Sequence, residues 1–178
     1  MRFRDALKKY AELDIENYPE QQSLLRVAQE RGADVAETAS RGKILDELFK
    51  TSVRPKLIQP TFITDYPIEL APLAKKNTED PRYADFFQLV VGGMELVKAY
   101  SELNDSVDQR SRFEEQEAAR VKGDEESQRI DEDFIEALEH GMPPAAGFGM
   151  GIDRLVMLLT NSHGIKETIL FPTLKPKT

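Results

Sequence analysis

The sequence predicts an α+β fold, in which a mainly antiparallel sheet is flanked by helices. Three observations support this class: helical periodicity near the start of the chain, a glycine-paired hairpin in the middle, and short strands that alternate with helices towards the end. Hairpins that alternate with helices leave few parallel crossovers, which is typical of α+β proteins.

The first part of the chain is predicted to be helical. Apolar residues recur at helical spacing in three stretches, residues 3–10, 19–32 and 40–53. A proline precedes the first turn of the second stretch, and Gly32 ends it. We assign residues 1–58 to a helical preamble and residues 59–178 to a second part. Both belong to one compact unit, because 178 residues can bury one continuous core but are few for two ordinary domains.

From residue 59 the signals change to those of strands and loops. The β-rich runs TFIT at 61–64 and PIEL at 67–70 lie among prolines, and a polar loop follows at 75–82. The tripeptide Asp65-Tyr66-Pro67 between the two runs is predicted to form a turn.

Residues 86–103 are predicted to form an antiparallel hairpin. The pair Gly92-Gly93 separates two apolar runs and readily adopts the positive φ angles of a tight turn. Such a turn sets Val90 opposite Glu95 and places Gln88 on the same face, one diagonal away.

Two helices, a strand and a further helix are expected after the hairpin. Ser106 followed by Gln109 matches a capping box at the start of a helix over 106–123, and acidic residues crowd the first turn of another over 131–141. Three more elements complete the prediction: a strand at 145–151, a buried helix at 152–164 and a short strand at 169–172.

Composition excludes several classes of protein. The net charge is −8, and residues 101–140 alone hold 14 acids against 5 bases, so a broad nucleic-acid surface of basic and aromatic residues is absent. There is no cysteine for a disulfide or a thiolate metal site. The longest apolar runs are much shorter than the roughly 20 residues that span a bilayer. We therefore expect a cytoplasmic protein.

The stretch AGFGMGIDRL at 146–155 is the strongest candidate for chemistry. Along a strand side chains alternate faces, so glycines at 147, 149 and 151 leave one face bare for a flat ligand. The N-terminus of the following helix, with Arg154 beside it, suits a phosphate. The same residues also fit close packing of a strand on a helix, and the spacing alone does not decide between the two interpretations.

This stretch resembles the third signature motif of class II aminoacyl-tRNA synthetases, a G-x-G-x-G-I-D-R strand and helix. Further blocks narrow the resemblance to lysyl-tRNA synthetases: PKLIQPTFITDYPIELAPLAK at 55–75, AYSELND at 99–105, DQRSRFEEQ at 108–116, LEHGMPPAAG at 138–147 and NSHGIKETILFP at 161–172. The resemblance implies the C-terminal half of a class II catalytic domain. It also implies that Gly149, Gly151 and Arg154 bind ATP, with Arg154 on the terminal phosphates.

The hairpin carries the remaining residues that the resemblance implies. In the family two glutamates seven residues apart hold Mg²⁺ on the ATP phosphates; here the second is Glu95, whereas the first position is Gln88, an uncharged and poorer ligand. Tyr100 stands where an aromatic ring packs on the substrate lysine, and Glu102 where a carboxylate pairs with its ammonium group. Gly149 borders the same lysine pocket.

Position 98 is usually asparagine in the family, near the carboxylate of the substrate. Lys98 either replaces it as a cation or points into solvent. Lys98, Tyr100 and Glu102 differ in parity from Glu95, so one convergent site requires a bulge or twist between Glu95 and Lys98.

The reaction implied is attack of the lysine carboxylate on the α-phosphorus of ATP, which gives lysyl-adenylate, followed by transfer to tRNA(Lys) in a homodimeric enzyme. The nucleophile is already ionised, so positioning and charge neutralisation suffice and no general base is needed. Motifs 1 and 2 and the anticodon-binding barrel of the family have no counterpart in these residues, so we expect a fragment that is inactive by itself. Two alternatives are a free-standing nucleotide- or amino-acid-binding module and a lysine-activating paralogue that modifies protein.

Overall fold

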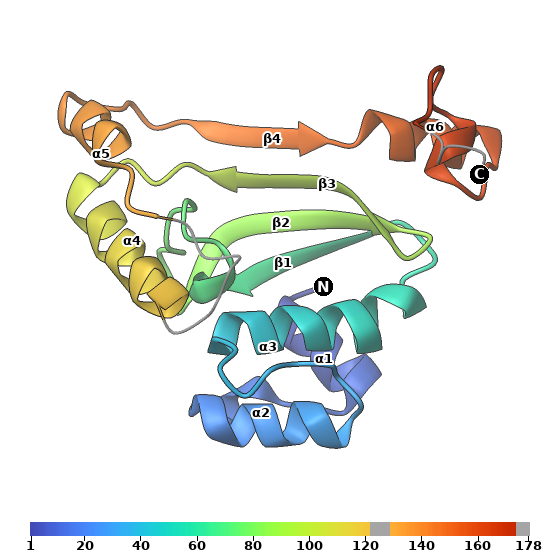
Figure 1. The fold of residues 1–178 in the computed structure, drawn as a ribbon, viewed down its shortest axis with the longest axis horizontal. Coiled ribbons are helices and arrows are strands. Elements are labelled where there is room, and N and C mark those ends of the chain that lie inside the picture. Colours follow the sequence, from blue (N-terminus) through green and yellow to red (C-terminus); the bar gives the residue numbers. More distant parts are fainter. Residues whose placement is uncertain (122–128, 174–178) are drawn as a thin grey trace, which may run out of the picture.

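Four strands form one antiparallel sheet in the computed structural model, which describes residues 1–121 and 129–173 (Figure 1). Their order in the sheet, β1-β2-β3-β4, follows the order in the chain. Their bounds are β1 Thr61–Pro67, β2 Tyr83–Val91, β3 Met94–Ser101 and β4 Ala146–Met150. With helices around this sheet, the α+β prediction is confirmed.

The hairpin β2–β3 forms as predicted. Gly92 and Gly93 have φ angles of 57° and 75°, which suit the two central positions of a hairpin turn. Val90 pairs with Glu95, but the next pair along β2 is Leu89 with Val97. One extra residue of β3, Leu96, is therefore bulged out.

Strand β1 runs further than the sequence indicated. Asp65 lies inside it and has a φ of 54°, at a register shift between Thr64 and Tyr66. The predicted turn over Asp65-Tyr66-Pro67 is thus wrong, because the chain absorbs the irregularity as a bulge and continues to pair with β2. The predicted strand PIEL is also wrong beyond Pro67, since Ile68–Leu70 forms a 3₁₀ turn.

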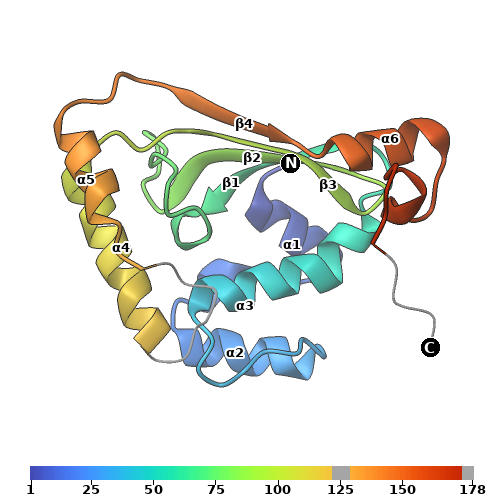
Figure 2. The ribbon, with the colours of Figure 1, turned by 45° about the horizontal axis from the view of Figure 1, so that its top comes forward.

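Helices near the N-terminus pack against one side of the sheet (Figures 1 and 2). They are α1 Phe3–Ala11, α2 Gln21–Glu30 and α3 Arg41–Leu48, and α3 continues as a π-helical turn over Phe49–Val53. Short 3₁₀ turns also lie at Ile15–Asn17, Arg54–Lys56 and Ile165–Glu167. One buried cluster joins these helices to Ile63, Tyr66 and Val90 of the sheet. Residues 1–58 and the sheet that follows them therefore share one hydrophobic core.

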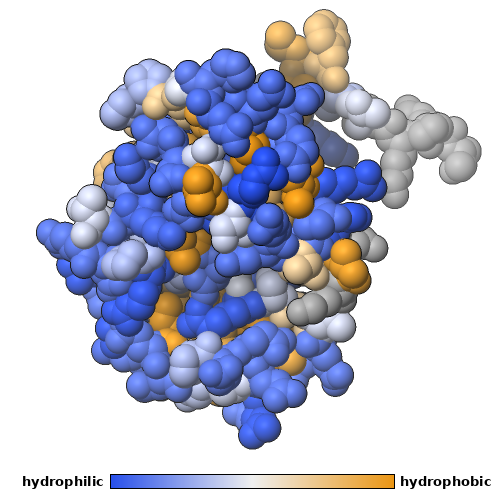
Figure 3. Space-filling model, turned by 90° about the vertical axis from the view of Figure 1, so that its left-hand side faces the viewer, coloured by the Kyte–Doolittle hydropathy of each residue, from blue (hydrophilic) through white to orange (hydrophobic). Residues whose placement is uncertain are grey.

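Helices α4, Ser106–Val121, and α5, Glu132–Glu139, pack against each other at one end of the sheet. The capping box predicted at Ser106 is wrong: Ser106 is already helical, and the Asp105 carboxylate accepts hydrogen bonds from the N–H groups of Val107 and Asp108. Residues 122 and 123 of the predicted helix lie outside the described residues. The outer face on this side is mostly hydrophilic, with scattered apolar residues (Figure 3).

Helix α6, Ile152–Thr160, follows β4 as predicted but is not buried. Only Met157 of α6 is fully covered, and Leu159 is 78% exposed. Helix α6 packs along β3 and the turn at Ile165–Glu167, but these described residues leave most of its apolar side chains only partly covered, which is why its hydrophobicity misled the burial prediction. The strand predicted at 169–172 is wrong, since these residues form bends and loop with Phe171 91% exposed.

The described part of the chain contains no helix long and apolar enough to cross a membrane.

Candidate functional site

The predicted ligand-binding side chains share one face of the sheet. Gln88 pairs with Lys98, which in turn pairs with Gly149, and Tyr100 pairs with Gly147 on the same strands. Directly opposite residues point to the same side of a sheet, so this face carries one row of side chains from β2 and β3 and the bare glycine backbone of β4.

The bulge at Leu96 brings Glu95 to the same face. Without an extra residue Glu95 and Lys98 point to opposite sides, because they are an odd number of positions apart. In the structure Glu95 pairs with Val90, and Lys98 pairs with Gln88. Glu95 and Lys98 therefore both lie on the side of the sheet that carries the even-numbered residues of β2. The strand thus has the bulge between Glu95 and Lys98 that a single convergent site requires.

The N-terminal helices cover only the β1–β2 half of this face. Ile63 of β1 and Val90 of β2 are completely buried beneath them, whereas Lys98 and Gly149 are exposed. On the opposite face Phe148 is 66% exposed. The β3–β4 half of the site face is therefore open to solvent at Lys98 and Gly149.

Tyr100 and Glu102 lie at the end of this face nearest α4 and α5. The ring of Tyr100 stacks on Phe86, with 5.8 Å between centroids and an interplanar angle of 16°, and it is half-buried against a cluster of three alanines, Ala71, Ala74 and Ala84. Partial burial raises the pKa of Tyr100, and the negative charge of Glu102 raises it further. The Glu102 carboxylate lies directly over Gly147, where any β-carbon would collide with it.

Arg154 marks the opposite end of the site. It belongs to the first turn of α6, and its Nη1 donates a hydrogen bond of 2.6 Å to the carbonyl oxygen of Glu95. Its side chain passes over Gly151, where an added β-carbon would lie 3.3 Å from the Arg154 Cδ. Gly151 thus leaves room for the arginine, and the guanidinium stands beside Glu95 at the N-terminus of a helix.

Two aromatic residues of the site were missed from the sequence. Tyr66, assigned to a turn, donates a hydrogen bond of 2.7 Å from its hydroxyl to Oε1 of Gln88, and its ring meets Phe86 edge-on at 4.6 Å. Burial raises the pKa of Tyr66 well above its usual value, helped by the charges of Glu95 and Asp46, so the phenol keeps its proton. Period-two alternation of 86, 88 and 90 is the signal that places Phe86 in the site.

Carboxylates in the site are too few for a metal-binding cluster. Within residues 1–121 and 129–173, no three His, Asp or Glu side chains gather closely enough to hold a metal ion. Glu95 can contribute one carboxylate ligand, whereas Gln88 offers an uncharged amide oxygen that already accepts a hydrogen bond from Tyr66.

Comparison with known proteins decides the family. A family model described as "tRNA synthetases class II (D, K and N)" matches residues 1–175. The chain belongs to the class II tRNA synthetases. The G-x-G-x-G-I-D-R stretch of this class II synthetase chain is therefore β4 with the first turn of α6.

Curated relatives of this class II synthetase chain are named lysine–tRNA ligase. That of Moorella thermoacetica is 51% identical over 97% of the chain, that of Helicobacter hepaticus 52% over 98%, and that of Shouchella clausii 50% over 96%. The chain covers 35%, 34% and 34% of these relatives, respectively. It thus spans about a third of their length.

Proposed function

We propose that the chain supplies the lysine-binding and part of the ATP-binding surface of a lysine–tRNA ligase. The enzyme activates lysine with ATP to lysyl-adenylate and transfers the lysyl group to tRNA(Lys). The observation that carries this proposal is the bulge at Leu96, because it brings Glu95 onto the face that already holds Tyr100 and Glu102. The names of the curated relatives support lysine as the amino acid.

The substrate lysine fits the Tyr100–Glu102 end of the face. Its aliphatic stem packs on the exposed part of the half-buried Tyr100 ring, and its ammonium group pairs with the Glu102 carboxylate. Gly149 lets the ligand approach the β4 backbone, since it presents no side chain on the site face, whereas Gly147 makes room for the Glu102 carboxylate.

ATP fits the Arg154 end. Its base and ribose lie along Gly149 and Gly151, and the guanidinium of Arg154 reaches the phosphates from the N-terminus of α6. The lysine carboxylate then attacks the α-phosphorus, and pyrophosphate leaves. Since the carboxylate is ionised at neutral pH, the protein only aligns the reactants and neutralises phosphate charge.

Mg²⁺ is the cation that the family implies on the phosphates, where it supplies positive charge. Glu95 fits as a ligand for one such ion, because Mg²⁺ is commonly held by one or two carboxylates together with substrate phosphates. Gln88 fits less well as a second ligand, since its amide oxygen carries no charge and already accepts one hydrogen bond from the Tyr66 hydroxyl.

The complete ligase is proposed to work in the cytoplasm as a homodimer, with tRNA(Lys) as its second substrate. The chain spans about a third of its relatives, so we expect the 178 residues alone to bind ligands without catalysing lysine-dependent exchange of pyrophosphate into ATP.

A chimera tests the proposal. The chain replaces the matching third of the Moorella thermoacetica ligase, and ATP–pyrophosphate exchange is measured with lysine and with other amino acids. We expect lysine-dependent exchange, and a loss of about 100-fold or more in kcat/KM for Arg154→Ala because transition-state charge is no longer stabilised. Arg26→Ala, at an exposed position on α2, is the control. A folded chimera that exchanges no pyrophosphate, or prefers another amino acid, would contradict the proposal.

A further inference from the structure

Lys98 and Gln88 are direct cross-strand partners on the site face. Glu95 lies next to them, because its partner Val90 is two residues from Gln88 along β2, or about 7 Å. The phosphate end of the site thus presents one carboxylate, one amide and one ammonium group close together, with Arg154 at its border.

The amide oxygen of Gln88 is already engaged. The Tyr66 hydroxyl donates a hydrogen bond of 2.7 Å to it. Tyr66 is itself 4% exposed, and its ring packs in the core against that of Phe3, with 4.8 Å between the ring centroids. The carbonyl oxygen is the only atom of a glutamine side chain that binds a cation. Gln88 is therefore held as a hydrogen-bond acceptor for Tyr66, with its NH₂ donors left over.

The side chain of Lys98 remains available to a ligand. It is exposed, its stem lies beside the bare backbone of Gly149, and no hydrogen bond or ion pair engages its ammonium group within the described residues. An ammonium group is a compact cation suited to phosphate oxygens.

The net charge at positions 88 and 98 is the same with Gln88 and Lys98 as with a carboxylate that holds a second metal ion. A carboxylate that holds one Mg²⁺ beside an uncharged side chain carries a net charge of +1, and Gln88 with Lys98 carries the same +1. Resting on the proposed function, we propose that the Lys98 ammonium group takes the place of one divalent cation on the ATP phosphates, while Gln88 serves as the anchor of Tyr66. The site then binds ATP with a single metal ion, held by Glu95.

The number of metal ions bound with ATP tests the proposal. Mn²⁺ is titrated into the 178-residue chain in the presence of ATP, free Mn²⁺ is followed by electron paramagnetic resonance, and ATP binding is measured by calorimetry. The variants are Lys98→Asn and the double variant Gln88→Glu/Lys98→Asn. The matched control is Gln59→Glu/Lys166→Asn, which makes the same exchange at exposed positions away from the site. Circular dichroism establishes that each variant is folded.

We expect one Mn²⁺ per bound ATP in the parent chain and the control, and two in the double variant. Lys98→Asn alone is expected to weaken ATP binding about tenfold at limiting Mn²⁺, the loss of one charge-assisted contact. Equal Mn²⁺ stoichiometry in all chains, or a Lys98→Asn variant that loses lysine binding instead, would overturn the inference and leave the proposed function standing. A parent chain that binds no ATP at any Mn²⁺ concentration would contradict the proposed function as well.

Discussion

Glu102 owes its position to a missing side chain on the neighbouring strand. Its carboxylate lies over Gly147 of β4, and its backbone N–H donates to the carbonyl of Ala145 at 3.0 Å. Any residue with a β-carbon at position 147 would collide with the Glu102 carboxylate in this position. The first glycine of the G-x-G-x-G stretch thus makes room for a protein carboxylate, whereas Gly149 stays bare for a ligand.

Gly147→Ala is predicted to weaken lysine binding while the fold survives. The new methyl group displaces the flexible end of Glu102, so the ion pair with the substrate ammonium group is lost or lengthened. We expect at least a tenfold rise in the Kd for lysine, measured by calorimetry, because charge-assisted hydrogen bonds contribute about 1.5–3 kcal/mol.

The matched control is Gly164→Ala, in a loop where an added β-carbon meets only Glu167 Oε1 at an ordinary 3.6 Å. Unchanged lysine affinity in Gly147→Ala would show that Glu102 does not hold the substrate.

At the scale of elements, α4 supports the site through a buried arginine. Arg112 is 7% exposed; its Nη1 donates to the carbonyl of Ala74 at 2.6 Å, and its Nη2 bonds the Asp108 carboxylate at 2.8 Å. Ala74 in turn bridges to Glu102 at the end of β3. The helix therefore holds the loop that flanks the lysine end of the site.

Arg112→Met is predicted to lower the free energy of unfolding by about 2–4 kcal/mol. The substitution leaves the buried carbonyls of Ala71 and Ala74 without their donor, and Asp108 keeps only Lys76 as a cationic partner. Arg112→Lys should not restore stability, because one ammonium group cannot reach both acceptors.

Urea denaturation measures this effect. Arg110→Met, two residues earlier on the same helix, removes only an exposed ion pair with Glu132 and should change stability little. Equal losses for the two variants would contradict the supporting role of Arg112.

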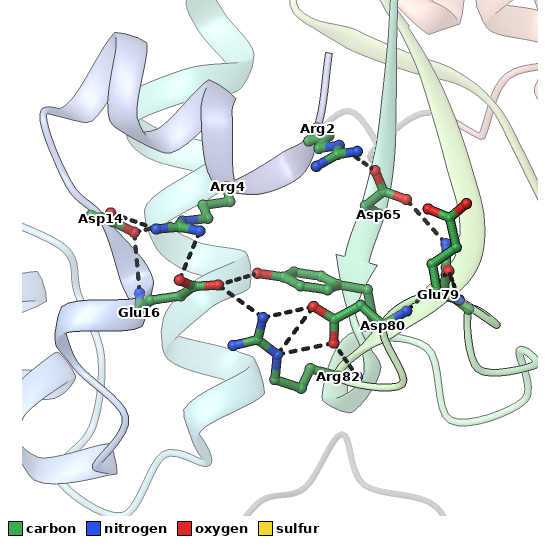
Figure 4. A network of polar contacts seen from close by, with 10 residues as sticks. Arg2, Arg4, Asp14, Glu16, Asp65, Glu79, Asp80 and Arg82 are labelled. Atoms are coloured by element: carbon green, nitrogen blue, oxygen red, sulfur yellow. Dashed lines mark hydrogen bonds and ion pairs between the residues drawn. The ribbon is translucent and has the colours of Figure 1, made fainter.

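At the scale of the whole molecule, a network of ion pairs joins the N-terminal helices to the sheet (Figure 4). Arg4 of α1 forms two hydrogen bonds of 2.7 Å with Asp14 and an ion pair of 2.7 Å with Glu16. Glu16 also pairs with Arg82, which precedes β2, at 3.2 Å. Segments from both parts of the chain are thus bound together.

Acid should weaken this network. The hydrogen bonds from Arg4 hold the pKa of Asp14 far below its usual value, with Lys8 and the Glu16 N–H adding to the effect. A carboxylate with a lowered pKa in the folded state stabilises the fold fully above its unfolded pKa of about 3.9, and this contribution is lost as pH falls through the folded pKa.

We therefore expect Asp14→Asn to be less stable than the parent chain by about 1 kcal/mol at pH 7, with the difference shrinking below pH ~4. Urea denaturation at several pH values measures it, with Asp34→Asn at an exposed position as the control. A difference that stays constant or grows in acid would contradict this assignment.

The sequence predicts much of this molecule, and the departures have physical causes. Gly92-Gly93 and the alternation in β2 and β3 are local signals, so the hairpin and the need for a bulge follow from them. The contact between Tyr66 and Gln88 is not local: it joins residues 22 positions apart and depends on the irregularity at Asp65. The burial expected for α6 depends on packing partners that the described residues do not supply.

Lysine binding by the 178-residue chain tests the central claim most directly. Calorimetry measures the binding of L-lysine to the parent chain, to Glu102→Gln and to the exposed control Glu30→Gln. The same three chains are titrated with norleucine, which lacks the ammonium group at the end of its side chain. We predict that the parent chain and Glu30→Gln bind lysine alike, and that Glu102→Gln binds it about 100-fold more weakly and no longer prefers it to norleucine. Equal lysine affinity in the parent chain and Glu102→Gln would contradict the account.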